Sequence, residues 1–378
     1  MYEMVDFDQD MTTIPFENSN AYNISPTEMW KRGSDIIKQF EQMDEMTKKL
    51  NECETERTKC LELRGSCISY LPSTLQCFDW VTSLCLDDTS IRKLENVPPN
   101  VRSINIMNGS IDIIDGTIFP LSLLSLCVTE SGVCNVIGLN DGIEEIILKS
   151  NRLKNICQIQ QSVIYLDVSD NSDLQTLPDL TNNPKLKILH MNATGITNID
   201  MLSDSIEKLE SCRCVIKIVN KLPKSLAVWK SYVCEISLIN CPFPEGMVEI
   251  DLFNNELKEI PILPKKVKTL DLCNNELIMF PEIVMDNQME HIDVRQNPKI
   301  SIDDIKKFML THTTIKVSYD DDSPPAYDDQ MRDDMEDFWG LRLRRRSDRI
   351  IQKPRNDFNS EYSPSNPHYI ILERVYRL

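Results

Sequence analysis

The sequence of 378 residues has few of the residue types on which cofactor and metal sites depend. It contains only ten glycines and four histidines, and it has no glycine-rich loop of the kind that cradles a phosphate group. The His residues lie far apart in the sequence. Cys212 and Cys214 look like a ligand pair, but Cys214 occupies a position of the repeat described below at which Cys is an ordinary substitute. The acidic stretch Asp167 to Asp173 lacks the Gly and terminal Glu of a calcium loop. We therefore expect no catalytic residue, no metal and no cofactor.

Long apolar runs are also missing. No window of about 18 apolar residues occurs, so we expect no membrane span. The N-terminal segment MYEMVDFDQDMTT is acidic and has no apolar centre, unlike a secretory signal. Thirteen cysteines show no paired spacing, which is typical of free thiols in a reducing compartment. These features predict an intracellular, cytoplasmic protein that is not secreted.

Basic residues are in deficit. The chain has 41 Lys and Arg against 59 Asp and Glu, which gives a formal net charge of −18. Binding to nucleic-acid phosphates relies on clustered Lys and Arg, so this composition excludes a general nucleic-acid-binding role. If charge steers association, the partners are basic or neutral proteins.

The most informative part of the sequence is a duplicated phrase between Ile250 and Phe280, IDLFNNELKEIPILPKKVKTLDLCNNELIMF. Apolar residues or Asn occupy offsets 0, 2, 5, 7 and 10 of each copy, and the second copy begins 20 residues after the first. A constant period of this length is the signature of a repeat architecture.

The same template recovers twelve copies within residues 61–302. They begin at Leu61, Leu84, Ile104, Leu126, Ile146, Leu166, Leu189, Leu209, Trp229, Ile250, Leu270 and Ile292. Offsets 0 and 2 alternate, which places two side chains of a short strand on one face. Stacked copies would form a parallel sheet about 55 Å long and bury these side chains in a continuous core.

Offset 5 is polar or small in every copy. Asparagine occupies it at Asn151, Asn171, Asn255, Asn275 and Asn297. A buried turn leaves backbone groups that need hydrogen-bond partners, and an Asn side chain offers both donors and an acceptor. We therefore predict a structural Asn ladder. Ser, Thr or Cys at this position supplies part of the bonding, whereas Gly109 supplies none.

This pattern resembles the leucine-rich repeat LxxLxLxxNxLxxL. The segments Leu222 to Leu226 and Ile260 to Pro264 resemble the LPxLPxxL return of the short bacterial-type class, and the Ile- and Asn-rich variant resembles leucine-rich repeat proteins of giant DNA viruses (mimivirus-like) and of amoebae. The resemblance implies an α/β repeat solenoid. Its expected form is a curved horseshoe with a parallel sheet on the concave face and an extended convex side.

The resemblance also implies a non-catalytic protein–protein interaction scaffold that binds a protein partner on the concave face. Offsets 1, 3 and 4 supply the exposed side chains of that face. The candidates are Asp167, His190, Arg213, Lys230, Tyr232, Asp251, Phe253, Asp271, Asp293 and Arg295. Asp251, Asp271 and Asp293 share one offset, which predicts an acidic row. The alternative is that all these positions are simply solvated.

The repeats are flanked by segments of different character. Residues 1–24 are polar and aperiodic, which predicts disorder, and residues 25–60 begin with the capping sequence Ser25 to Glu28 and continue as an amphipathic helix. That helix either caps the open end of the core or serves self-association through Ile36, Phe40, Met43 and Leu50. Residues 303–319 are expected to form a C-terminal cap of helix and strand.

Residues 320–378 form a charged, low-complexity tail. Pro324, Pro325 and Tyr327 belong to a PPAY sequence that resembles the ligand of WW domains, so an adaptor that recruits a WW-domain ubiquitin ligase is an alternative function. The basic stretch Arg342 to Arg355 indicates either nuclear import or a tail that folds back on the acidic repeats. A structural virion component is a further alternative. A ligase domain with its own Cys nucleophile is excluded, since the last cysteine is Cys273, inside the repeats.

Overall fold

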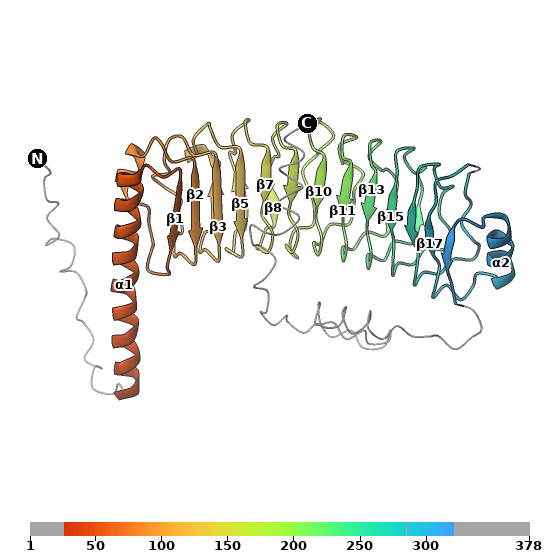
Figure 1. Ribbon diagram of the computed structural model, residues 1–378, viewed down its shortest axis with the longest axis horizontal. Helices are drawn as coiled ribbons and strands as arrows, with labels where there is room; N and C mark the ends of the chain where they lie inside the picture. Colours follow the sequence, from red (N-terminus) through yellow and green to blue (C-terminus); the bar gives the residue numbers. More distant parts are fainter. Residues whose placement is uncertain (1–25, 285, 321–378) are drawn as a thin grey trace, which may run out of the picture. The chain divides into compact units, whose positions relative to one another are not determined.

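A computed structural model of the chain describes residues 26–284 and 286–320 (Figure 1). Its main feature is one sheet of thirteen parallel strands, which follow one another in chain order. The strands are β1 Cys60–Arg64, β2 Ser83–Asp87, β3 Ser103–Met107, β5 Ser125–Thr129, β7 Glu145–Ile147, β9 Tyr165–Asp167, β10 Ile188–His190, β11 Lys208–Glu210, β13 Val228–Lys230, β15 Glu249–Asp251, β16 Thr269–Asp271, β17 His291–Asp293 and β18 Lys316–Ser318.

The register of this sheet follows the sequence template. The first residue of each of the twelve copies lies opposite the first residue of the next, from Leu61 on β1 to Ile292 on β17. Val317 on β18 continues the row as a thirteenth member. The parallel solenoid expected from the sequence is therefore confirmed.

Side chains at offsets 0, 2 and 7 fill the interior. In the copy that begins at Leu270, residues Leu270, Leu272 and Leu277 are at most 1% exposed. Burial of one such side chain stabilises the fold by about 1.5–3 kcal/mol. Trp229 takes the place of an aliphatic residue in its copy, is fully buried, and packs edge-to-face on Phe243 with ring centroids 6.3 Å apart.

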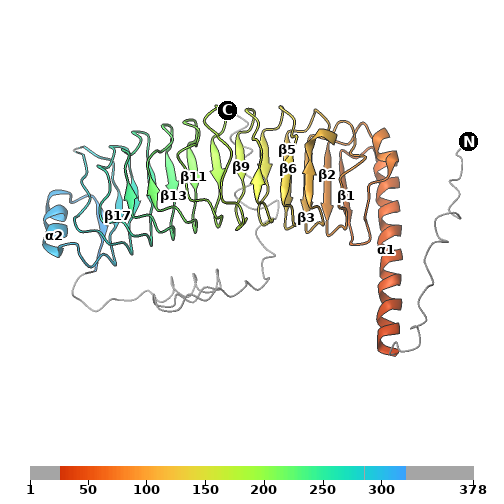
Figure 2. The ribbon, with the colours of Figure 1, turned by 180° about the vertical axis from the view of Figure 1, so that it is seen from behind.

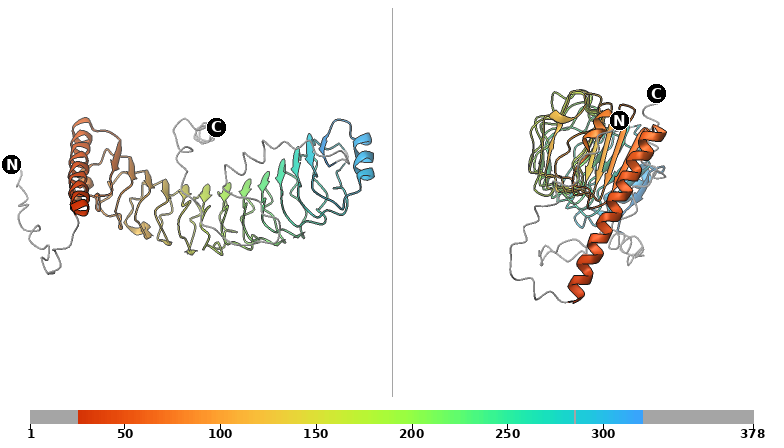
Figure 3. Two further views of the ribbon diagram at one scale, coloured as in Figure 1. Left: turned by 90° about the horizontal axis from the view of Figure 1, so that it is seen from below. Right: turned by 90° about the vertical axis from the view of Figure 1, so that its left-hand side faces the viewer.

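The return segments are short and extended, as expected from the period. Among residues 60–284 and 286–301, no α-helix lies between successive strands of the main sheet (Figure 2). Two small parallel sheets form here, β4 Ile113–Asp115 with β6 Asn135–Ile137 and β8 Asn155–Ile156, and β12 Ile218–Val219 with β14 Leu238–Ile239. Turns of 3₁₀ helix cover Ser73–Cys77 and Gly116–Ile118. The strands of the main sheet lie along the inner side of the arc formed by these turns (Figure 3).

Helix α1, Pro26–Glu56, packs against β1 at one end of the sheet. Its Pro occupies the first helical position, where a missing N–H costs nothing. Met46 and Cys53 are buried in the contact, and Met43 and Leu50 are partly buried. Ile36 and Phe40, which the sequence places on the same apolar face, are instead exposed. Only the C-terminal half of the helix therefore covers the core.

Helix α2, Ile302–Thr311, covers the other end of the core together with β18. The Ser301 hydroxyl caps the helix and accepts a hydrogen bond from the Asp304 N–H. Phe308 packs on Phe280, with ring centroids 4.5 Å apart, and Ile305 is buried. These contacts seal the last turn.

Offset 4 has a left-handed backbone in all twelve copies. Positive φ angles occur at Gly65, Asp88, Asn108, Glu130, Ser150, Asp170, Ala193, Arg213, Val233, Asn254, Asn274 and Gln296. This conformation turns the chain after each strand, and the offset-5 side chain that follows is directed inward. Glycine and Asn adopt it at little cost, whereas a β-branched residue such as Val233, with φ +59°, is strained.

The inward Asn side chains bridge successive turns. Asn275 Nδ2 donates to the carbonyl oxygens of Leu252 and Leu272, at 2.9 and 3.0 Å, and its Oδ1 accepts from the Leu257 N–H at 3.1 Å. Bonds of the same kind occur at Asn151, Asn171, Asn255 and Asn297. The Cys214 and Cys234 thiols donate to carbonyl oxygens of the preceding turn, those of Met191 and Ser211, and of their own turn, those of Cys212 and Tyr232.

Candidate protein-binding face

The concave face is built from strand side chains that alternate with the buried ones. Offset 1 forms a row across neighbouring strands, which consists of Glu62, Cys85, Asn105, Cys127, Ile147, Asp167, His190, Glu210, Lys230, Asp251, Asp271 and Asp293. After Glu62 the row is uncharged as far as Ile147, then carries mixed charge, and ends in three aspartates. The face therefore has chemically distinct zones along its length.

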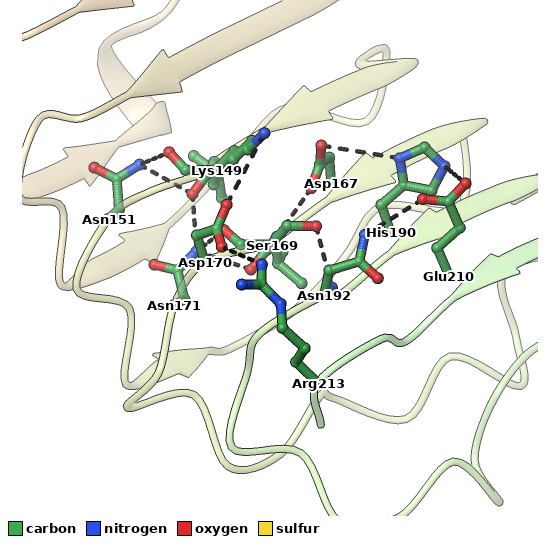
Figure 4. Close-up of polar contacts among 12 residues, drawn as sticks. Lys149, Asn151, Asp167, Ser169, Asp170, Asn171, His190, Asn192, Glu210 and Arg213 are labelled. Carbon is green, nitrogen blue, oxygen red and sulfur yellow. Dashed lines mark hydrogen bonds and ion pairs between the residues drawn. The ribbon is translucent and has the colours of Figure 1, made fainter. Parts of the chain in front are cut away.

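His190 lies at the centre of the mixed-charge zone (Figure 4). Its Nδ1 is 3.1 Å from the Tyr165 hydroxyl and 3.9 Å from Asp167 Oδ2, and its Nε2 is 3.8 Å from Glu210 Oε1. Lys208 Nζ lies 2.8 Å from the same Glu210 oxygen. Burial acts to raise the pKa of Glu210, but His190 and Lys208 outweigh it, so that this pKa is lowered. Glu210 is therefore a stable carboxylate at neutral pH.

A second polar group occupies the edge of the face next to this zone. Asp170 lies 3.9 Å from Lys149 Nζ and 3.5 Å from Arg213 Nη2 (Figure 4). Burial raises the pKa of Asp170, although both cations oppose the increase. The ion pair with Asp170 directs the Arg213 side chain toward the preceding turns of the solenoid.

The three aspartates of the acidic row lie on adjacent strands. Asp251 on β15, Asp271 on β16 and Asp293 on β17 are in register. Burial raises the pKa of Asp251 and Asp271, the latter to about 6, and the neighbouring carboxylates contribute to the increase at Asp271. Asp293 is paired with Arg295, whose Nη2 lies 2.6 Å from Asp293 Oδ2. Asp251 and Asp271 are therefore neighbouring carboxyl groups whose ionisation is opposed by burial.

Two aromatic side chains border the acidic row. Tyr232 and Phe253 occupy offset 3 of neighbouring copies, and both are half-buried. Burial raises the pKa of the Tyr232 hydroxyl, with a further contribution from Cys212, so this group stays protonated. Lys230 pairs with Glu249 at 2.8 Å beside them. Aromatic area beside charged groups is typical of the residues that anchor protein interfaces.

The ten residues predicted for this face differ in how they are placed. Asp167 and Asp293 are only 5% and 4% exposed, and each accepts the backbone N–H two residues ahead, from Ser169 and Arg295. They brace the turns from within. The other eight are half-exposed or exposed and face the concave side, namely His190, Arg213, Lys230, Tyr232, Asp251, Phe253, Asp271 and Arg295.

Sequence reasoning missed a flanking row at offset −1. Tyr165, Lys208 and Glu249 belong to it, and each contacts a residue of the central row. The template started at offset 0, so the preceding strand residue was not considered. Extending the two-residue alternation backwards by one step would have found these side chains.

Other chemistry is sparse in the described part of the chain. All thirteen cysteines are free thiols. Among residues 26–284 and 286–320, no three His, Cys, Asp or Glu side chains are grouped as metal ligands, and no helix is long and apolar enough to cross a membrane. The PPAY residues Pro324, Pro325 and Tyr327 and the basic stretch Arg342 to Arg355 lie outside the described residues.

Comparison with known proteins relates the chain to leucine-rich repeat proteins at the level of fold. No family model matches the sequence. It is 25% identical over 200 residues to the disease resistance protein RRS1 of Arabidopsis thaliana, a match that spans 51% of this chain and only 15% of that protein. The APL1 leucine-rich repeat domain superposes with a TM-score of 0.50 at 14% identity, over 71% of this chain and 81% of that one.

YopM from Yersinia enterocolitica aligns over 72% of this chain and 87% of its own, with 17% identity and a TM-score of 0.43. The thirteen-stranded parallel sheet, the buried Leu and Ile positions and the Asn bonds between turns account for the likeness to the APL1 leucine-rich repeat domain in physical terms. The protein thus has the fold of the leucine-rich repeat solenoids.

Proposed function

We propose that the protein is a non-catalytic scaffold that binds a protein partner on its concave face. The observation that carries this proposal is the acidic row, where Asp251 and Asp271 stay side by side although burial raises the pKa of each carboxyl. In a solenoid with no partner, such a pair costs stability. A partner that brings positive charge to the row would remove that cost and convert it into binding energy.

The surroundings of the row define the partner further. Tyr232 and Phe253 offer half-buried aromatic surface within one copy of Asp251. A protein segment with Lys or Arg beside an apolar side chain matches this combination, because the cation faces the carboxylates while the apolar group packs on the rings. The Arg295–Asp293 pair limits the charged site to Asp251 and Asp271.

The experiment compares full-length variants in partner capture with quantitative mass spectrometry. Asp251→Lys together with Asp271→Lys reverses the charge of the row. The matched control is Glu259→Lys with Glu282→Lys, two exposed carboxylates of return segments in the same copies. We expect proteins captured by the wild type to be lost with the first variant and kept with the second. Equal capture by both variants would refute the proposed site.

A photo-cross-linking residue at Phe253 then tests contact directly. We expect it to link to a partner peptide that carries Lys or Arg within a few residues of the linked position. Links only to acidic or uncharged peptides would contradict the charge-based assignment, even if the concave face were used.

The PPAY sequence supports a second proposal, an adaptor that brings a WW-domain ubiquitin ligase to whatever the concave face holds. The motif combines the two prolines and the tyrosine on which WW recognition depends. Tyr327→Ala should abolish binding of a WW domain and leave concave-face capture unchanged. Retained binding of a WW domain would exclude this role.

A further inference from the structure

The N-terminal half of α1 presents an apolar surface that the solenoid does not cover. Ile36, Ile37 and Phe40 are 52%, 62% and 68% exposed. Every residue from 34 to 41 is exposed, and contact with the array begins near Gln42, whose Oε1 accepts the Cys67 N–H at 3.1 Å. In Figures 1 and 3, this half of the helix projects beyond the first turns of the solenoid.

A helix of this kind needs a partner. Residues 26–41 span about 24 Å at 1.5 Å per residue. A helix segment of about 16 residues without tertiary packing is marginally stable in water, because most helical stability in proteins comes from packing of an apolar face. The exposed trio lies at helical spacing, since residues 36, 37 and 40 fall on one side of the helix. The side chains that would stabilise the segment are therefore present and uncovered.

The charges along α1 indicate what the partner is. The segment from Lys31 to Lys38 contains three basic residues and one acidic residue, whereas Glu41, Asp44 and Glu45 follow without an intervening base. The ion pairs of α1 in the described part of the chain join Lys48 and Lys49 to Glu52, beyond both segments. An identical helix in antiparallel orientation would place each basic segment beside the acidic segment of the other copy. A parallel pair would place like charges together.

We propose that the protein forms a two-fold symmetric homodimer through the exposed half of α1, with the two helices antiparallel and Ile36, Ile37 and Phe40 at the centre of the contact. A two-fold axis lets one apolar patch serve both copies. The dimer presents two concave faces, so that a partner with two recognition segments binds more tightly than to a single copy.

The test measures the mass of the full-length protein by sedimentation equilibrium across a concentration series. We expect a concentration-dependent dimer for the wild type. Phe40→Glu should weaken self-association by about 100-fold or more, because each dimer would bury the new charge twice. Leu310→Glu on α2, a residue that is 79% exposed, is the matched control and should leave the dimer intact. A wild type that stays monomeric at tens of micromolar would overturn the proposal.

Orientation is tested by charge exchange and by cross-linking. Lys31→Glu with Arg32→Glu should weaken the dimer, and adding Asp44→Lys with Glu45→Lys should restore it. A photo-cross-linking residue at position 44 should link to residues near position 32 of a second copy. Links to position 44 of the second copy would indicate a parallel pair. Links to residues 1–25 of the same chain would show that this segment, and not a second copy, covers the apolar surface of α1. Either result would overturn the antiparallel dimer.

Discussion

A hydrogen bond of 2.9 Å from Asn275 Nδ2 to the Leu252 carbonyl oxygen joins two adjacent turns of the solenoid. The same amide serves Leu272 and Leu257, and Asn275 is only 4% exposed. Removal of the amide would leave the buried Leu257 N–H without its partner and take one of two Asn bonds from each of the Leu252 and Leu272 carbonyl oxygens, which keep the bonds from Asn255 and Asn297. A single side chain thus contributes to the stability of two neighbouring turns.

Substitution of Asn275 by alanine should therefore lower the free energy of unfolding by about 2–4 kcal/mol. Urea unfolding followed by circular dichroism measures the change. The exposed Asn240→Ala is the control and should remain within about 0.5 kcal/mol of the wild type. A similar small change for Asn275→Ala would show that the ladder is not a source of stability.

Leu270 tests the core. It lies on β16, is 1% exposed and is in register with Ile250 and Ile292. Leu270→Asp should cost several kcal/mol, since an unpaired carboxylate would be buried among aliphatic side chains. The volume-conserving Leu270→Met should cost less than about 1.5 kcal/mol. Thermal unfolding of both proteins checks the prediction, and a neutral Asp variant would be incompatible with the register.

Val233 is a strained residue that a substitution should improve. Its φ of +59° is unfavourable for a β-branched side chain, and the equivalent positions of the next two copies carry Asn254 and Asn274. Val233→Asn should raise the free energy of unfolding by about 1 kcal/mol. Val215→Asn, at another exposed valine outside the left-handed positions, should bring no gain. Chemical denaturation of the two variants gives the comparison.

Asp271 should make stability depend on pH. Its pKa is raised to about 6 in the folded protein, mainly by burial. The folded state therefore binds a proton more tightly than the unfolded chain. The protonated Asp271 carboxyl contributes to the free energy of unfolding, and this contribution is fully present below the pKa of the unfolded chain. It is lost as the pH rises through 6, and the loss is at most about 3 kcal/mol.

Asp271→Asn should abolish that loss, because its side-chain oxygen can still accept the Cys273 N–H that Asp271 binds at 2.9 Å. We expect the variant to be more stable than the wild type at pH 7.5 and similar to it at pH 4. Unfolding free energies measured from pH 4 to 8 give the comparison. Parallel pH curves for the two proteins would contradict the assignment.

The fold could be predicted from the sequence because its determinants are periodic. A residue such as Leu270 faces the core for the same reason as Ile250, so one good copy locates the others, even where Trp229 replaces an aliphatic residue. The face was less predictable. Asp167 and Asp293 are more buried than Asp251 and Asp271, although all four accept the N–H two residues ahead, so the repeat position alone does not separate them. The contact of Tyr165 with His190 joins side chains in adjacent copies and leaves no periodic signal.

The asparagine bonds are not continuous along the solenoid. Thr194, Cys214 and Cys234 occupy three consecutive positions between Asn171 and Asn255. A thiol or hydroxyl makes fewer bonds than an amide, so the contacts between these turns are weaker than those of the asparagine-bearing turns on either side. We expect those two flanking blocks to separate here under mechanical load, and amide hydrogens to exchange faster here than within the blocks. His190 and Glu210 lie on adjacent strands of the copies that contain Thr194 and Cys214. A ligand that binds both residues would therefore hold these two turns together.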